Sequence, residues 1–433
     1  MKNIIVETTS RCNLSCSMCL RHSWKESEGD MDLDVFRSIL SSSSKPDSLS
    51  LSGYGEPFLH PRLIDMIRMA RERLPNHSRI HLTSNGTLPD RGVLQDAIQA
   101  GLNGIAISVD SLQADQFQLI RGGASLRTVT ECLESLAALR ERLSFSLEFS
   151  TVAMERNIQE LPDLVGFAAE HGVERIWVNN VLPYTEKIAA ETLYDSPSED
   201  VLELFRRTRG RLRDLGADPG SLLGLVKKLF SLRGAPTFVP SGTLSPAEDL
   251  VLGLARELAS VNLSMGGIRD MLLRVFERDE ARWLRSAEIF RKSDEIAARH
   301  HIELHLPLLV PKTQRECNFV KTETCFITWQ GWVRPCNQLS HDYDCFHYGR
   351  PKAVKSVSFG KIPEESLESI WNSEACRVFR EKVVEFPFSP CGDCGLSDGC
   401  GYIDPDSGFL CDCNMCEQPC GDCLWSRGIL QCP

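Results

Sequence analysis

The chain has 433 residues, which is long enough for two or three domains with large buried cores. Its 48 basic and 59 acidic side chains give a net charge of −11, spread along the chain rather than collected in a tail. This argues against nucleic acid or an anionic membrane as a partner, because both need clustered lysine and arginine.

The remaining composition indicates a cytoplasmic metalloprotein. No apolar stretch reaches transmembrane length, and Met1 leads directly into a predicted strand without the apolar core of a signal peptide. Eighteen cysteines in a cytosolic chain of this size indicate metal rather than disulfides. Three of them open the chain, and fourteen lie between Cys317 and Cys432. We therefore expect two metal regions at opposite ends of the sequence.

The first metal region follows an apolar run at residues 4–6 that predicts a buried strand. Directly after it, Cys12, Cys16 and Cys19 have the spacing C-x3-C-x2-C. Three thiolates hold three irons of a cubane cluster and leave the fourth iron open, as a site that performs chemistry requires. The alternatives are a disulfide loop or a zinc knuckle, for which His22 is near enough in sequence to be a fourth ligand.

From residue 3 to about 182, apolar β-rich runs alternate with amphipathic helical ones. This alternation predicts a parallel sheet with right-handed crossovers, but periodicity does not choose between a barrel and an open doubly wound sheet. The strands are expected at 4–8, 49–52, 79–83, 104–109, 144–151 and 175–181, with helices near 32–41, 61–73, 90–100, 126–142 and 158–171.

Polar or glycine-rich segments follow three successive predicted strands, at residues 53–57, 83–86 and 108–111. Reactive groups of parallel sheets collect at the carboxyl ends of the strands, so these segments should lie together. Each would be an ordinary turn by itself. Because they follow successive strands, their polar groups together suit a ligand that has a ribose and a carboxylate.

The alternation stops after residue 182. Amphipathic patterns at 201–215, 222–232, 247–259 and 271–298 predict helices, and residues 234–246 predict a loop among them. This helical part is a candidate lid or partner-docking element.

Cysteines dominate the end of the chain. Cys317, Cys325 and Cys336 are followed by a predicted helix at 367–384, in which Trp371 and Cys376 should pack. The later cysteines form a dense series: Cys391, Cys394, Cys400, Cys411, Cys413, Cys416, Cys420 and Cys423. Zinc ribbons are the alternative to iron–sulfur clusters here, because paired C-x2-C units are standard zinc spacing.

These motifs resemble the radical SAM superfamily, and the pattern from Cys317 onward resembles its SPASM extension. The resemblance implies an α/β fold: a partial (β/α)6 TIM-barrel core at 1–190, a helical insertion at 191–306 and a small SPASM-like auxiliary iron–sulfur domain at 307–433. In that family a reduced 4Fe-4S cluster splits S-adenosylmethionine into methionine and a 5′-deoxyadenosyl radical.

The resemblance also assigns residues. Met18 stands where the family usually has an aromatic side chain near the adenine, and Tyr54 replaces a glycine of the family's G-G-E-P element. The residues implied to bind S-adenosylmethionine are Gly55, Glu56, Pro57, Ser84, Asn85, Ser108, Asp110 and Arg121.

Two auxiliary 4Fe-4S clusters are implied as well. One is expected to use Cys317, Cys325 and Cys336, and the other Cys391, Cys394 and Cys400. The tail cysteines complete them in a pairing that the sequence leaves open, and Asp404 stands where the family has a further cysteine.

A narrower resemblance lies in residues 178–186, 325–329 and 420–433, which look like radical SAM/SPASM maturases associated with tungsten-pterin aldehyde oxidoreductases. It implies hydrogen abstraction during maturation of such an oxidoreductase or its pterin cofactor, with a ferredoxin or flavodoxin as electron donor. One alternative is an enzyme that modifies a protein or ribosomal peptide substrate. The other is a non-catalytic iron–sulfur scaffold, which would keep the cysteines but not the polar groups at the strand ends.

Overall fold

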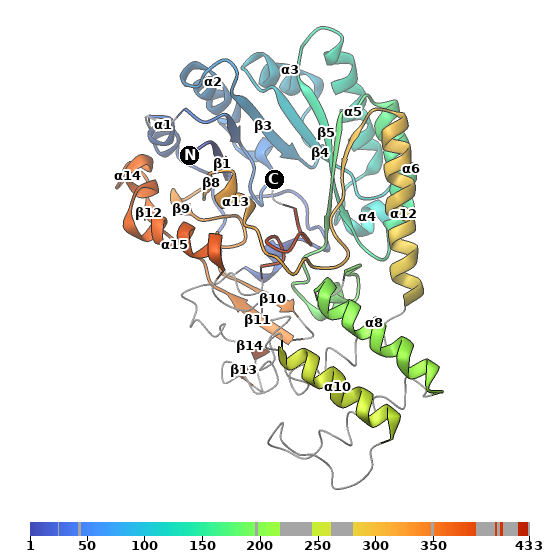
Figure 1. The fold of residues 1–433 in the computed structure, drawn as a ribbon. Helices are drawn as coiled ribbons and strands as arrows, with labels where there is room; N and C mark the ends of the chain where they lie inside the picture. The colour runs from blue at the N-terminus through green and yellow to red at the C-terminus, as the bar shows by residue number, and fades with distance from the viewer. Residues whose placement is uncertain are drawn as a thin grey trace.

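A ten-stranded sheet forms the centre of the molecule (Figure 1). The computed structural model describes residues 1–24, 26–41, 45–194, 198–216, 245–260, 280–347, 350–386, 403–404, 408–409 and 423–431. The strand order is β12-β9-β8-β1-β2-β3-β4-β5-β6-β7. The first six strands are β1 (Asn3–Val6), β2 (Ser48–Ser50), β3 (Arg79–Ser84), β4 (Gly104–Ser108), β5 (Ser146–Ala153) and β6 (Arg175–Asn180).

All five pairings among β1–β6 are parallel, as the alternating pattern predicts. Helices connect the strands and cover the outer face of the sheet (Figure 1). They are α1 (Leu33–Leu40), α2 (Leu63–Arg73), α3 (Arg91–Gln99), α4 (Ala114–Ile120), α5 (Leu126–Arg140), α6 (Leu161–Glu170) and α7 (Glu186–Ala189), with 3-10 turns η1 (Leu20–Ser23), η2 (Pro57–Leu59) and η3 (Ile158–Glu160). The sequence prediction missed α4.

Side chains of the strands alternate between two environments. In β3, Ile80 and Leu82 are fully buried against the helices, whereas Arg79 and His81 point to the half-buried inner side of the sheet. On that inner side the buried Glu148 of β5 binds both Arg79 and Arg175, which neutralises the carboxylate. The main apolar layer therefore lies between sheet and helices, and the inner side of the barrel is polar at β3 and β5.

The cysteine-rich part continues the same sheet. Strand β8 (Thr324–Ile327) pairs in parallel with β1, and β9 (Trp332–Arg334) and β12 (Gly360–Lys361) follow it in antiparallel pairs. At the opposite edge, β7 (Glu303–His305) pairs in parallel with β6. The pairing of β8 with β1 brings the second metal region beside the first, which the sequence alone did not indicate.

Further elements complete the C-terminal part. A second sheet has the order β10-β11-β14-β13, formed by β10 (Tyr343–His347), β11 (Arg350–Val354), β14 (Gly408–Phe409) and β13 (Ile403–Asp404). The helices are α13 (Asn318–Lys321), α14 (Leu367–Trp371) and α15 (Glu374–Glu385). The single helix predicted at 367–384 is thus two helices, because the Ser373 side chain accepts a hydrogen bond from the Cys376 N–H and begins a new one.

Three helices lie in the central part: α8 (Glu199–Asp214), α10 (Pro246–Ser260) and α12 (Glu280–Arg299). They support the helical patterns predicted at 201–215 and 247–259 and the second half of 271–298, while residues 222–232 lie outside the described ranges. Helix α12 lies along α6, and its Ile289 and Phe290 join the barrel core. Within the described ranges, no helix is both long and apolar enough to span a membrane.

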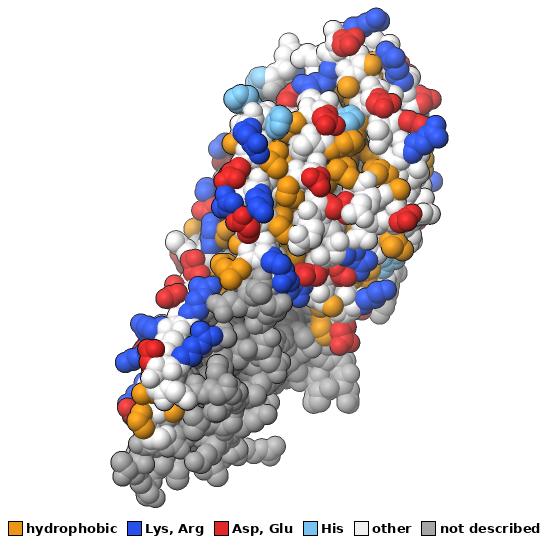
Figure 2. Space-filling model, turned by 90° about the vertical axis from the view of Figure 1, so that its right-hand side faces the viewer, with side chains coloured by type: hydrophobic (Ala, Val, Ile, Leu, Met, Phe, Trp, Pro, Cys, Tyr) orange, Lys and Arg blue, Asp and Glu red, His pale blue; other side chains and the backbone are white. Residues whose placement is uncertain are grey.

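The face that carries α6 and α12 has mixed charge. Figure 2 shows basic and acidic side chains interspersed over it, with apolar side chains between them. Neither sign gathers into a continuous patch on this face.

Candidate functional site

The first cysteine loop leaves the buried end of β1 and is held tightly at its base. Thr9 Oγ donates to Asp30 at 2.7 Å, and the Arg11 guanidinium binds the same carboxylate at 2.6 Å. After this base come Cys12, Cys16 and Cys19, which are all partly exposed. The Cys19 N–H donates to the Cys16 carbonyl at 3.0 Å, so the loop curls and presents its three thiols at the carboxyl end of β1.

Two glycines let neighbouring segments approach this loop closely. A Cβ at Gly55 would lie 2.2 Å from the Thr9 carbonyl oxygen, and one at Gly122 would lie 2.0 Å from that of Ser15. Gly122 also has a positive φ of 52°, a conformation that other residues rarely adopt. The segment after β2 and the turn after α4 therefore fix the cysteine loop from two sides.

Glu56 and Ser84, both predicted to bind S-adenosylmethionine, bind each other. Ser84 Oγ donates to the Glu56 carboxylate at 2.8 Å, and the Asn85 N–H donates to it at 2.7 Å. Burial raises the pKa of Glu56, and these donors oppose that rise. Pro57 follows as the first residue of η2. The hydrogen bonds of Glu56 therefore connect the segment after β2 with the end of β3.

The Asn85 side chain reaches the cysteine loop itself. Its Nδ2 donates to the Asn13 side chain at 2.9 Å and lies 3.8 Å from the Cys12 sulfur. Its carbonyl accepts from the Thr87 N–H at 2.9 Å, which fixes the orientation of the amide. Asn85 is therefore placed to position Cys12 and whatever Cys12 binds.

Asp110 and Arg121 form a buried ion pair beside Cys16. The Arg121 Nε lies 2.5 Å from the Asp110 carboxylate, whose other oxygen accepts the Val152 N–H at 2.7 Å. Burial alone would lower the pKa of Arg121, but Asp110 and the Cys16 thiol raise it. Ser108 ends β4 at the same edge and is buried. The pair holds the Arg121 guanidinium against the cysteine loop, with its charge balanced by Asp110.

The protein surroundings of Cys16 and Cys19 favour the protonated thiol when no metal is bound. Burial raises the pKa of Cys16 to about 11 although Arg121 opposes it, and burial also raises the pKa of Cys19. Thiolates bind metals, so metal binding must displace these protons.

The zinc alternative receives no support from His22. Its Nε2 lies 2.9 Å from the Cys16 carbonyl oxygen, so it bonds to the loop backbone. Among the described residues, no three Cys, His, Asp or Glu side chains form a group that would hold one metal ion. Zinc draws thiolates to about 2.3 Å from a single ion, whereas a cubane spreads them over different irons.

The sequence prediction missed Tyr184, which packs against Met18. Both belong to one apolar cluster with Ile120, Met154 and Val181, and the Tyr184 hydroxyl donates to the Ser17 carbonyl. An aromatic ring thus lies next to the position where the family's own aromatic residue is replaced by Met18. Tyr184 is part of the segment 178–186, but nothing local in the sequence indicates this contact.

In the second metal region, Cys317, Cys336 and Cys423 lie together. Burial raises the pKa of Cys317 to about 11, and the nearby Cys423 thiol raises it further. Burial raises the pKa of Cys336 well above its usual range, with Cys423 and Cys317 as the next causes. Cys345 packs in the same cluster of side chains. A site built from these thiols would lie at the inner side of β1, because Ile5 packs against Cys317 and Cys336.

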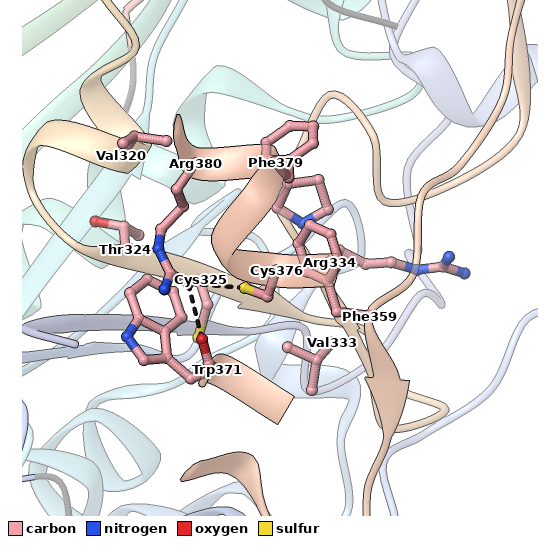
Figure 3. A pocket seen from close by; sticks show the side chains of 11 residues that line it. Val320, Thr324, Cys325, Val333, Arg334, Phe359, Trp371, Cys376, Phe379 and Arg380 are labelled. Atoms are coloured by element: carbon pink, nitrogen blue, oxygen red, sulfur yellow. Dashed lines mark hydrogen bonds between the residues drawn. The ribbon is translucent and has the colours of Figure 1, made fainter. Parts of the chain in front are cut away.

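Cys325 is not brought to these thiols. It lies on the face of β8 opposite to Phe326, in the core between sheet and helices. There it lines a small pocket together with Cys376 (Figure 3). The Arg380 guanidinium donates to the Cys376 sulfur at 2.9 Å and to the Trp371 carbonyl at 2.9 Å. Trp371 and Cys376 pack here, as predicted.

The other predicted cysteine ligands lie outside the described residues. They are Cys391, Cys394, Cys400, Cys411, Cys413, Cys416 and Cys420.

The site has three thiols on one curled loop. Arg121 lies against Cys16, and the Asn85 amide lies against Cys12. This arrangement fits an iron–sulfur cluster with an open iron. Comparison with known families agrees. Residues 6–168 match the family described as the radical SAM superfamily, and residues 317–395 match SPASM, an iron–sulfur cluster-binding domain. The protein is a radical SAM enzyme with a SPASM domain. Its cofactors are S-adenosylmethionine and iron–sulfur clusters, and its partial (β/α)6 barrel is the radical SAM core.

Among similar proteins, one relative matches this radical SAM enzyme over its full length. It is the tungsten-containing aldehyde ferredoxin oxidoreductase cofactor-modifying protein of Pyrococcus furiosus, 27% identical over 100% of this chain and 97% of the relative. A GTP 3′,8-cyclase of Chlorobaculum tepidum is 28% identical, but over only 38% of this chain and 49% of the cyclase.

A solved structure supports the fold. The chain superimposes on Streptococcus suis SuiB bound to S-adenosylmethionine with a TM-score of 0.54. The match covers 95% of this chain and 76% of SuiB at 13% identity. At that identity the likeness concerns the fold alone.

Proposed function

We propose that this radical SAM/SPASM enzyme abstracts a hydrogen atom during the maturation of a tungsten-pterin aldehyde oxidoreductase or its cofactor. The observation that carries the proposal is the full-length match to a cofactor-modifying protein of such an oxidoreductase. The match spans the barrel, the central helices and the SPASM domain, whereas the match to the GTP cyclase spans a smaller share of the chain.

The residues take distinct roles in this proposal. Cys12, Cys16 and Cys19 hold the cluster, which when bound supplies one electron to cleave S-adenosylmethionine. Asn85 and Arg121 orient the cofactor, because they contact the cysteine loop directly. Gly55, Glu56, Pro57, Ser84, Ser108 and Asp110 complete the binding set, with Glu56, Ser84 and Asp110 acting mainly by fixing their neighbours.

In the SPASM part we assign Cys317, Cys336 and Cys423 to one auxiliary cluster. Their thiols lie together in the described structure, and Cys325 lies on the other face of its strand. The second auxiliary cluster is proposed on Cys391, Cys394 and Cys400. A low-potential iron–sulfur or flavin protein, such as ferredoxin or flavodoxin, would donate the electrons.

The test is a gene deletion in the source organism, followed by mass analysis of the tungsten oxidoreductase and its extracted cofactor. Without this enzyme we expect the oxidoreductase or its pterin cofactor to change in mass and lose activity. The wild-type gene should restore both, and a gene with Cys12, Cys16 and Cys19 changed to alanine should not.

Two outcomes would contradict the proposal. Unchanged mass and activity of the oxidoreductase and its cofactor would rule out a role in their maturation. A mass change that appears only in an unrelated peptide would favour the peptide-modifying alternative.

A further inference from the structure

A buried histidine connects the two metal regions. His341 lies in the loop between β9 and β10, and its Nε2 lies 3.1 Å from the Glu7 carboxylate at the end of β1. Its Nδ1 lies 2.9 Å from the Glu26 carboxylate. The side chains of His341 and Glu7 are 1% and 0% exposed, whereas that of Glu26 is 27% exposed. The three groups therefore form a chain that runs from the surface into the barrel.

The contacts favour the protonated form of the ring. An ionised carboxylate only accepts hydrogen bonds, so a ring that bonds two carboxylates donates from both nitrogens and carries a positive charge. Burial would lower the pKa of His341, but the bonds to Glu7 and Glu26 outweigh burial and raise it. Trp24 stacks on the imidazole with the ring centroids 4.0 Å apart, which adds a cation–π contribution.

Tyr54, the residue that departs from the family's glycine, closes this assembly. Its ring meets the edges of Trp24 and His341 at centroid distances of 4.9 and 5.9 Å. Its hydroxyl donates to the Asn337 carbonyl at 3.0 Å, directly after Cys336 in the chain. Burial raises the pKa of Tyr54, and the next cause is the charge of Cys336. His341 is therefore a close neighbour of a residue that lies beside the Cys336 thiol.

The other charged groups around His341 have neighbours of opposite charge. Arg334 lies near Glu26, Asp342 and Glu7, and burial lowers its pKa although these acids oppose the change. Asp342 is paired with Lys355 at 2.9 Å, and its N–H donates to Glu26. The phenol of Tyr54 has its pKa raised and stays neutral. Among these kinds of side chain, imidazole is the one whose ordinary pKa lies closest to neutral pH.

We propose that His341 is a positioning residue that couples proton uptake to reduction of the auxiliary iron–sulfur site containing Cys336. When that site accepts one electron from its iron–sulfur or flavin donor, the added negative charge favours the protonated ring. At a pH above the pKa of the ring in the oxidised protein, one proton then passes from solvent by way of Glu26 to the unprotonated ring nitrogen, and reoxidation releases the electron and the proton together. This inference rests on the proposed assignment of Cys336 to a cluster.

The coupling is measurable as a potential, independently of turnover. In holoenzyme, the reduction potential of the auxiliary cluster is followed by EPR between pH 6 and 9.5. Between the pKa of His341 in the oxidised protein and its higher pKa in the reduced protein, we expect the wild-type potential to fall as pH rises, by at most about 59 mV per pH unit, the value for one proton per electron. At lower pH it should be flat, because the ring is protonated in both redox states.

Three variants separate coupling from a merely structural role. His341→Gln should have a pH-independent potential. Glu26→Gln removes one negative partner and lowers the pKa of the ring, so its sloping region should begin at lower pH even if His341→Gln does not fold. Glu28→Gln is the matched control, since Glu28 is an exposed carboxylate of the same segment bound to Arg21, and it should behave as wild type.

A wild-type potential that is flat across the whole range would overturn the inference and leave the assembly as a structural contact between the domains. If the protein shows the signal of the first cluster but no auxiliary signal, the ligand assignment itself is wrong. These two failures are therefore distinguishable.

Discussion

Protein with Cys12, Cys16 and Cys19 all changed to alanine should form no 5′-deoxyadenosine from S-adenosylmethionine. The three thiols lie on one loop at the carboxyl end of β1, and removing them removes every proposed protein ligand of the first cluster. The measurement is chromatography of 5′-deoxyadenosine after anaerobic reconstitution and reduction. We expect complete loss, because a cluster that is not held cannot deliver its electron to the bound cofactor.

The auxiliary thiols provide the control for this experiment. Cys317, Cys336 and Cys423 pack in one cluster of side chains and are not changed in the triple variant, so this variant should keep most of its auxiliary iron. Cys132 offers a matched substitution, because it is a buried core cysteine of α5. Cys132→Ala should keep the cleavage activity. Formation of 5′-deoxyadenosine by the triple variant would contradict the assignment of the first cluster.

The second large effect is expected for Asp110→Ala. This change leaves the Arg121 guanidinium buried without its carboxylate, and breaking a buried ion pair in this way costs about 3–5 kcal/mol of unfolding free energy. Arg121 also loses its fixed position beside Cys16. Binding of S-adenosylmethionine should therefore weaken by about ten- to a hundredfold, comparable to one lost buried hydrogen bond. Urea unfolding and equilibrium binding measure the two effects.

Asp65→Ala is the matched control for Asp110→Ala. Asp65 pairs with Arg62 and Arg68 on the surface of α2, and such exposed pairs contribute little. Its stability should stay within about 0.5 kcal/mol of the wild type. If Asp110→Ala is as stable as Asp65→Ala and binds the cofactor normally, the ion pair of Asp110 and Arg121 supports neither the fold nor binding of S-adenosylmethionine.

The barrel could be predicted because each of its strands and helices is indicated by a pattern within a short stretch of sequence. Residues in β1–β6 are apolar with period two or in short runs, and the intervening helices have apolar positions three and four apart. Helix α4 was missed because its seven residues follow a polar strand end that reads as a turn. The pairing of β8 with β1 joins residues more than 300 positions apart, and a single sequence has no local signal for it.

The site was predicted residue by residue, but the relations between its residues were not. Asp110 and Arg121 were expected as separate ligands of the cofactor, and the structure makes them partners of each other. Glu56 and Ser84 are related in the same way. Such pairs form between strand ends that lie far apart in sequence, so composition and spacing cannot indicate them. Whether each group also contacts the cofactor stays a prediction.

Cys325 shows a limit of motif spacing. The resemblance to the SPASM pattern implies a cluster shared with Cys317 and Cys336, but side chains on a strand alternate between faces. Phe326 takes the face toward Cys317 and Cys336, and Cys325 takes the opposite one. The sequence alone cannot tell which face of this short strand meets the other thiols.

The metal content of the anaerobically purified native protein tests the central claim most directly, because the claim requires clusters at both ends of the chain. Three cubanes of four irons predict roughly twelve irons per chain and no stoichiometric zinc. About four irons together with stoichiometric zinc would contradict this account, because the cysteine-rich part would then be a structural zinc domain.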